Sequence, residues 1–428
     1  MAMKRRTVIL FLLAAIALGC ASLALGLFKS TPPEQLAQAT VKGTEASGHY
    51  PYCAEDSLAK PGHCNDLQRL DPDYYVSQNW PWENKQISID GSTLNIGQLV
   101  SPRGRDAFLN SISIAPNGHP VAVGGPSLLI ASTSNAAQTW HVQTFSRFAD
   151  ALRDVAFSQD STGFAVGNNG IILRSQDAGQ TWHVYNETYN TPDAPALQSK
   201  IEGEAYAVSF ADNNTAISGG NAHMVRTTDA GQHWRSVPPD FNSQAIQDIA
   251  FSDANNGWAI GTGGMVFRTQ DQGASWHAVT IASPDTMLMG LDFIDNYGCM
   301  AGSWQVWCTT DGGESWVKSH IDLPAGAKEN NGHDITRLKL ANTQQGWFTT
   351  NKGHIYQTRD GGKTWQLWFN INNSEYVAEA EIWGLAIAED TVWAVGSGRF
   401  PGKHGNATEP VTPMLPFAPL VLSWPTKH

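Results

Sequence analysis

Five aspartates recur in one short phrase of this 428-residue chain. The phrase reads Ser or Thr, any residue, Asp, any residue, Gly, two more residues and Trp, and its copies begin at residues 175, 227, 269, 309 and 358. Carboxylates can serve as acid–base catalysts, but an Asp followed two places later by Gly is also typical of a tight turn. There the carboxylate accepts backbone N–H hydrogen bonds and the Gly supplies a positive φ. We therefore predict structural roles for five residues, Asp177, Asp229, Asp271, Asp311 and Asp360.

Four cysteines are spaced to form disulfides, and a fifth, Cys20, belongs to an N-terminal apolar segment. Cys53 and Cys64 bracket one loop, whereas Cys299 and Cys308 flank one predicted hairpin turn. Opposed residues in a hairpin have β-carbons about 4.5–5.5 Å apart, near the range that a disulfide requires. A metal site is the alternative, but the chain has no CxxC or HxxxH spacing to support one. We therefore predict two disulfides and no metal.

The aspartate phrase is half of a longer repeat. Its tryptophans, including that of a degenerate sixth copy at 133–140, recur every 40 to 52 residues, a spacing typical of propeller blades. Upstream of each phrase lies a short apolar strand, a turn and a second strand similar to Ala-Val-Gly. This first half occurs seven times, and the last copy, at 383–396, lacks the phrase. The pattern predicts an all-β fold, a seven-bladed β-propeller of four-stranded blades.

The boundaries follow from where the repeats begin and end. We place the propeller at 86–428 and read 29–85 as a linker with an irregular N-terminal extension. The seventh repeat ends on an apolar strand at 419–424 and needs an outer strand from elsewhere. The segments 86–89 and 94–96 are the natural donors, which predicts a composite blade that joins the two ends of the domain.

The N-terminus predicts export. Three cations at residues 4–6 precede an uncharged apolar run at 8–28, which is long enough to cross a bilayer. The cations should stay in the cytoplasm and send the rest of the chain to the periplasmic or extracytoplasmic face. Residues 1–28 are thus a signal anchor or a cleaved signal peptide. Ala17 to Cys20 also resembles a lipobox, so Cys20 is a lipidation candidate and all three outcomes stay open.

The net charge of −12 argues against nucleic acid as a partner. Propellers bind ligands at the mouth of the central channel, where the innermost strands begin. Aligning the repeats places seven candidates near one mouth, namely Arg153, Asp154, Tyr206, Gln247, Asp248, Arg337 and Trp383. Glu202, Glu204, Glu379 and Glu381 lie close by in the same alignment. This mixture would suit a peptide, and ordinary hydrogen bonding between blades is the alternative.

Together, the Asp-box phrase and the preceding strand similar to Gly-Trp-Ala-Val-Gly resemble the photosystem II stability and assembly factor family over about residues 100–397. The resemblance implies a propeller beyond a membrane that holds a membrane-protein intermediate during complex assembly. Such factors are associated with an arginine-rich patch, which has no residue-by-residue match here. Arg174, Arg226 and Arg268 do occupy one position in three consecutive repeats, and we interpret them as a ridge belonging to the repeat itself.

A glycoside hydrolase similar to sialidases is the alternative, because those enzymes also carry Asp-boxes on propellers. The usual Phe/Tyr-Arg-Ile-Pro signature is absent near the first blade. No acidic pair stands out by its spacing as an acid and nucleophile. We therefore predict a binding or assembly factor without catalysis or cofactor, whose partner is a membrane or envelope protein complex.

Overall fold

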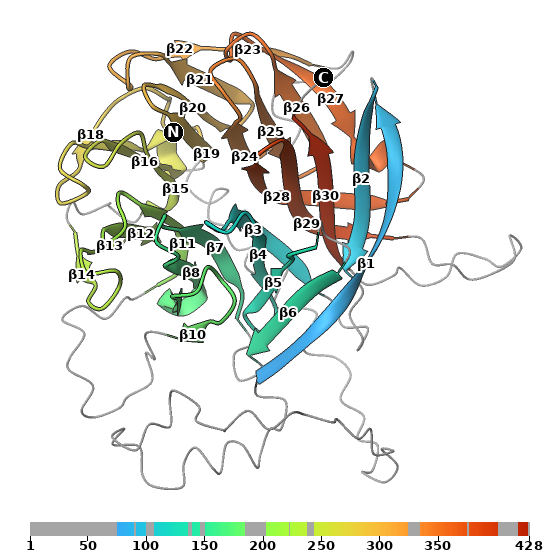
Figure 1. The fold of residues 1–428 in the computed structure, drawn as a ribbon. Coiled ribbons are helices and arrows are strands. Elements are labelled where there is room, and N and C mark those ends of the chain that lie inside the picture. Colours follow the sequence, from blue (N-terminus) through green and yellow to red (C-terminus); the bar gives the residue numbers. More distant parts are fainter. Residues whose placement is uncertain are drawn as a thin grey trace, which may run out of the picture. The chain divides into compact units, whose positions relative to one another are not determined.

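Seven blades of β-sheet surround a central axis in the computed structural model, and the first and seventh blades belong to one nine-stranded sheet (Figure 1). The structure describes residues 75–89, 91–99, 107–135, 139–145, 150–184, 203–221, 223–237, 244–323, 334–374, 376–400 and 418–426. The predicted anchor, Cys20, the Cys53–Cys64 pair and Glu202 lie outside these residues. Within them every regular element is a β-strand except for three short 3₁₀ turns, so the all-β prediction and the propeller prediction are confirmed.

Blades two to five are separate four-stranded antiparallel sheets. From inner to outer strand, blade by blade, they are β7 (Leu152–Phe157), β8 (Gly163–Gly167), β9 (Ile172–Ser175) and β10 (His183–Val184); β11 (Ala205–Phe210), β12 (Ala216–Gly220), β13 (Met224–Thr227) and β14 (Arg235–Ser236); β15 (Ile246–Phe251), β16 (Gly257–Gly261), β17 (Val266–Thr269) and β18 (His277–Ala278); β19 (Leu288–Ile294), β20 (Tyr297–Gly302), β21 (Gln305–Thr309) and β22 (Val317–Lys318). Each third strand ends at the Ser or Thr that opens the repeated phrase, so the phrase forms the turn into the outer strand.

Blade six has a fifth strand. Its main strands are β24 (Ile335–Leu340), β25 (Gly346–Thr350), β26 (His354–Thr358) and β27 (Thr364–Asn370). The additional strand β23 (His320–Asp322) pairs in parallel with β27 at the outer edge. Short 3₁₀ turns η2 (Asn168–Gly170), η3 (Thr262–Gly264) and η4 (Ile371–Asn373) complete the described elements between strands.

The first and seventh blades are joined through the N-terminal strands. Blade one contains β3 (Phe108–Ile114), β4 (Pro120–Gly125), β5 (Leu129–Ser132) and β6 (Thr139–Phe145), and blade seven contains β28 (Glu379–Ala388), β29 (Thr391–Arg399) and β30 (Ala418–Pro425). The strand β2 (Ser92–Leu99) pairs with β30, and β1 (Tyr75–Ile89) pairs with β2 and then with β6 (Figure 1). The composite blade is therefore confirmed, but the predicted start at residue 86 is eleven residues late, because the first half of β1 extends blade one.

The hydrophobic core lies between blades. The described residues form seven buried clusters, and each combines side chains of two neighbouring blades. One example joins Val123 of blade one to Leu173 and Trp182 of blade two. The inner strands contact one another in order, and β28 meets β3. No single blade buries both of its faces alone, so the ring is stable only when closed.

The repeated aspartates organise the turns in which they lie. Asp271 accepts hydrogen bonds from the Ser275 amide at 2.9 Å, the Ser275 hydroxyl at 2.6 Å and the Thr269 hydroxyl at 2.8 Å. Gly273 follows with a φ of 78°. Partial burial disfavours the charged carboxylate, but these bonds outweigh it and hold the pKa of Asp271 below its usual value. The other four aspartates accept the same backbone hydrogen bond from the residue four places later.

In blades three and four, the arginine before the phrase connects its blade to the next one. Arg226 donates through Nε to the carbonyl of Gln272, 2.9 Å away in the following blade's turn. Arg268 lies over the ring of Trp258, its partner across the sheet, and reaches Glu314 of the following turn at 2.6 Å. These contacts between blades support the interpretation of the arginine ridge as part of the repeat.

In blade five a disulfide replaces that arginine. Cys299 and Cys308 pair across β20 and β21, at the positions that Trp258 and Arg268 hold in blade four, and they form the predicted bond. Gly362, in the turn of blade six, lies directly over it, since an added β-carbon would be 2.4 Å from the Cys308 sulfur. The disulfide therefore lies in the interface between blades five and six.

Replacing both cysteines is expected to destabilise the folded propeller. A disulfide that closes a loop of this length constrains the unfolded chain, so the double variant Cys299→Ser/Cys308→Ser should lose about 2–3 kcal/mol of unfolding free energy. Urea denaturation followed by circular dichroism measures the loss. An unchanged transition midpoint would contradict the prediction, and thiol counting on the unfolded, unreduced wild type provides the control.

Candidate binding site at the channel mouth

A β-bulge occurs at the same place in every inner strand. In each case the register shifts by one residue, which leaves that residue unpaired. The seven bulged residues are Asn110, Arg153, Tyr206, Gln247, Met289, Thr336 and Trp383. All are partly exposed except Thr336, although the residues on either side of them are buried. The bulges therefore present a ring of seven unlike side chains where the inner strands begin.

Hydrogen bonds hold five of these side chains, and those of Asn110 and Thr336 go to the main-chain carbonyls of Leu152 and Ile382. Arg153 donates through Nε to the side-chain oxygen of Asn168 at 2.9 Å. The Tyr206 hydroxyl donates to Glu204, and the Trp383 indole nitrogen lies 3.4 Å from Glu381. Burial, together with Glu204, raises the pKa of Tyr206, so its hydroxyl remains a donor. The ring thus contains a guanidinium and two aromatic side chains, and two carboxylates lie beside it.

One residue further along the strands, an ion-pair network crosses the channel. The Arg337 guanidinium lies 3.2 Å from Asp154 and 3.3 Å from Asp248, two carboxylates on different blades. All three residues are at most 8% exposed. Asp154 also accepts hydrogen bonds from the Ser111 hydroxyl and the Val208 amide, and Asp248 accepts from the Leu291 amide. Each aspartate therefore fastens its inner strand to that of a neighbouring blade.

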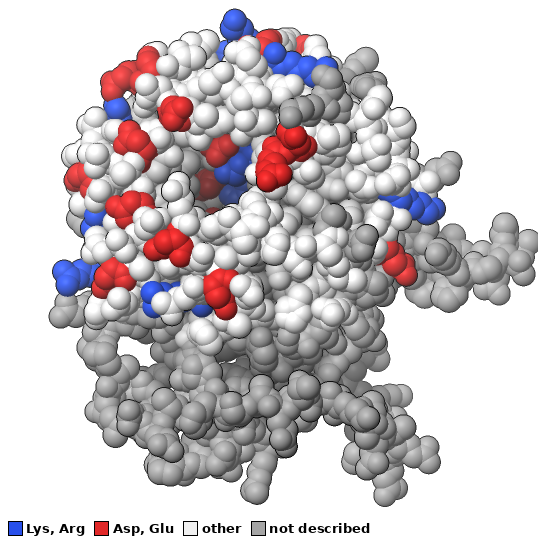
Figure 2. Space-filling view, viewed as in Figure 1, with Lys and Arg blue, Asp and Glu red and all other residues white. Residues whose placement is uncertain are grey.

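A second ion pair lies deeper in the channel, and its cation, Lys339, is two residues after Arg337 on β24. Lys339 contacts Asp292 at 2.8 Å, and the same carboxylate accepts a hydrogen bond from the Leu340 amide. Figure 2 shows basic and acidic side chains together inside the hollow at the centre of the ring. With Asp154, Asp248 and Arg337 below the bulges, the channel holds three carboxylates and two cations among the described residues.

The structure divides the seven candidates taken from the sequence. Arg153, Tyr206, Gln247 and Trp383 are bulge residues. The other three, Asp154, Asp248 and Arg337, are buried in the network. The prediction omitted Asn110, Met289 and Thr336, which the same repeat alignment would have placed in the ring. It also omitted the Asp292–Lys339 pair, which no spacing signal reveals because its members are on different blades.

Among the described residues, no group of three or more His, Cys, Asp or Glu side chains is arranged to hold a metal ion. None of the described helices is long and apolar enough to cross a membrane.

The chain matches a known family and its curated members. The model of the family described as photosynthesis system II assembly factor YCF48 matches residues 132–243 and 240–373, together more than half of the chain. Photosystem II assembly lipoprotein Ycf48 of Prochlorococcus marinus strain MIT 9313 is 34% identical over 253 residues, which cover 50% of this chain and 73% of the relative. Its namesake in Synechococcus strain CC9902 is 29% identical over 144 residues, covering 32% and 41%.

A solved structure extends the likeness to the fold. The complex described as YCF48 bound to D1 peptide aligns with a TM-score of 0.54 and 17% identity, covering 80% of this chain and 94% of that one. These relatives are named as assembly factors rather than enzymes. The alignment with the Synechococcus relative spans less than half of that protein's length. From its repeats, its fold and the family match, the chain belongs to the photosynthesis system II assembly factor YCF48 family.

Proposed function

We propose that this chain is a non-catalytic assembly factor that binds an exposed segment of a membrane protein at the ring of bulged residues. The single observation that carries the proposal is the ring itself, in which seven different side chains, six of them partly exposed, occupy the same position of the seven inner strands. Uniform positions maintain the fold, whereas variable and partly exposed ones on a rigid scaffold are suited to recognition.

The composition of the ring favours a peptide. Arg153 and Gln247 can donate to peptide carbonyls or a carboxylate, and Glu204 and Glu381 can accept from peptide amides. Tyr206 and Trp383 offer rigid aromatic surface of the kind enriched in binding hot spots. The buried network of Arg337 lies beneath the ring, so a ligand would lie across the mouth and not thread the channel. A D1 peptide is the natural probe, since a relative is described as bound to one.

We place the propeller on the periplasmic or extracytoplasmic face, anchored to the inner membrane by residues 8–28 or by a lipid at Cys20. The cationic N-terminus and the apolar run support this placement, as do relatives named as lipoproteins. Attachment to the bilayer raises the effective concentration of the binding ring for membrane partners. A factor that captures intermediates during assembly would benefit from that confinement.

Charge reversal at the ring is expected to weaken binding. The variant Arg153→Glu should bind a fluorescently labelled D1 peptide about tenfold less tightly, because a charge-assisted hydrogen bond is replaced by repulsion. Fluorescence anisotropy with the complete exported domain measures the affinity. The matched control is Arg235→Glu, the same charge change on the exposed outer strand of blade three.

Two results would contradict the proposal. One is equal affinity in the wild type and Arg153→Glu, with both proteins unfolding at the same temperature. The other is absent peptide binding together with hydrolysis of a sialoside or β-glucan at an ordinary enzymatic rate, which would favour the glycoside hydrolase alternative.

A further inference from the structure

The second strand of blade six is not covered by a turn of the next blade, whereas the second strands of blades two, three and four are. In the turns of blades three, four and five, a glycine packs on a large residue of the preceding blade's second strand. The pairs are Gly231 on Phe164, Gly273 on Ile217 and Gly313 on Trp258. Blade seven has no such turn, because its outer strand β2 comes from the other end of the chain. The residue that the turn would cover, Trp347, packs instead against Trp424, with ring centroids 6.4 Å apart.

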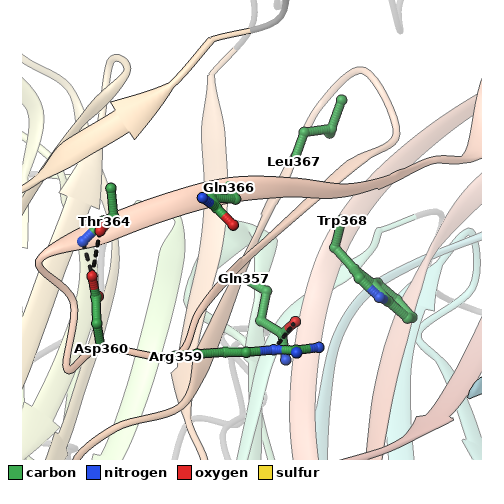
Figure 3. Close-up of a pocket in the computed structure, with 7 residues that line it drawn as sticks. All are labelled: Gln357, Arg359, Asp360, Thr364, Gln366, Leu367 and Trp368. Atoms are coloured by element: carbon green, nitrogen blue, oxygen red, sulfur yellow. Dashed lines mark hydrogen bonds between the residues drawn. The ribbon is translucent and has the colours of Figure 1, made fainter. Parts of the chain in front are cut away.

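A cavity opens beside this substitute contact, on the outer part of blade six. We call it the notch, and it is lined by Gln357, Arg359, Asp360, Thr364, Gln366, Leu367 and Trp368 (Figure 3). Its volume is about 280 Å³. Pockets for small-molecule ligands usually measure roughly 300–1,000 Å³. The notch therefore suits one side chain with its adjoining backbone better than a complete cofactor.

The notch offers mainly hydrogen-bond donors. Arg359 donates to the amide oxygen of Gln357 at 3.1 Å, and this hydrogen bond leaves the NH₂ group of Gln357 free to donate. Arg359 forms no ion pair with any described residue. The buried indole nitrogen of Trp368 has no hydrogen-bond partner in the described part of the chain. The one carboxylate, Asp360, is occupied by its own turn, through the amide and hydroxyl of Thr364. A carboxylate or carbonyl oxygen is the complement of such a set.

The other blades show what kind of group fills this place. Gln357 stands opposite Trp347 in the sheet, as Arg268 stands opposite Trp258. Arg268 binds the carboxylate of Glu314 in the next blade's turn, and Arg226 binds a main-chain carbonyl in the equivalent turn. We propose that the notch binds an acidic peptide turn of a protein partner, which takes the place of the absent seventh Asp-box.

The chain itself supplies a suitable probe. The fluorescein-labelled peptide TTDGGESW copies residues 309–316, the turn whose glutamate pairs with Arg268. We expect saturable binding to the complete exported domain with a Kd below about 1 mM. Arg359→Ala should weaken binding about tenfold, and the peptide TTDGGQSW should bind about tenfold more weakly to the wild type. On Arg359→Ala the two peptides should differ little, because the glutamate then has no partner.

The matched control is Lys363→Ala, which removes an exposed cation from the same turn without touching the notch. It should leave the affinity unchanged, as should Arg235→Glu, the control variant on the exposed outer strand of blade three. Absent binding, equal affinity in Arg359→Ala, or an equal loss in Lys363→Ala would each overturn the proposal. The last result would mean that the peptide is held only by general attraction to positive charge.

Discussion

A chain that starts at residue 100 is expected not to fold as a monomer, whereas one that starts at residue 72 should fold normally. The truncation removes β1 and β2, and with them four buried side chains, Trp82, Leu94, Ile96 and Leu99. Burying each contributes about 1.5–3 kcal/mol, so roughly 6–12 kcal/mol is lost. That is comparable to the entire stability of a typical domain, about 5–15 kcal/mol. Size-exclusion chromatography and circular dichroism of the two chains measure the outcome.

A point variant tests the same closure within the complete chain. Gly97 lies where β2 meets β1, and an added β-carbon would come within 2.3 Å of the Glu83 carbonyl oxygen. Gly97→Val should therefore lower the thermal unfolding midpoint strongly, while Thr93→Val, at an exposed position of β2, should change it little. A stable monomer beginning at residue 100 would show that the ring does not depend on the N-terminal strands.

The variant Arg337→Met is expected to cost about 3–5 kcal/mol of unfolding free energy, because it leaves Asp154 and Asp248 buried without their cation. The matched control is Arg399→Met, which breaks the more exposed pair with Glu379 and should cost at most about 1 kcal/mol. Adding Asp248→Asn to Arg337→Met should restore part of the loss, since one uncompensated charge is removed. Urea denaturation measures all four proteins.

The loss should also depend on pH. Burial raises the pKa of Asp248 to about 6, although Arg337 and Lys339 oppose the rise. The ordinary pKa of an Asp is 3.8, so the folded state binds this proton more tightly than the unfolded state does. The stability gained from this proton is therefore complete below pH 3.8 and disappears as the pH rises through about 6. Without Arg337 the pKa should rise further. The difference in unfolding free energy between wild type and Arg337→Met should therefore shrink as the pH is lowered from about 7.5 to about 5. A constant difference would argue against a charged Asp248 at neutral pH.

The features tested by these two predictions also support the proposed binding site. The N-terminal strands β1 and β2 close the circle of blades, and in the sequence the segment before them leads back to the predicted membrane anchor. The ion-pair network forms the floor beneath the bulged residues. Asp248 and Arg337 are therefore poor positions at which to test partner binding, because their variants would change stability, whereas Arg153 is partly exposed and suitable.

The sequence by itself determined the repeat and everything that is local within it. The turns follow from the order of Asp, Gly and Trp, the seven blades from seven copies of the Gly-flanked strand, and the Cys299–Cys308 bond from two cysteines on one hairpin. The composite seventh blade was also predictable, because a repeat that lacks its outer strand must obtain one elsewhere. Each of these conclusions depends on neighbours in the chain or on a count of copies.

Only the tertiary structure decided which equivalent positions differ in burial and partners. Asp154 and Arg153 are adjacent in sequence, yet one is buried and the other partly exposed, because a bulge of one residue separates the ring from the network. The pairing of Arg337 with Asp154 joins residues 183 positions apart across the channel. The notch likewise exists because a turn is missing from the neighbouring blade. Such features depend on the angular order of the blades around the axis, which no spacing within a single repeat encodes.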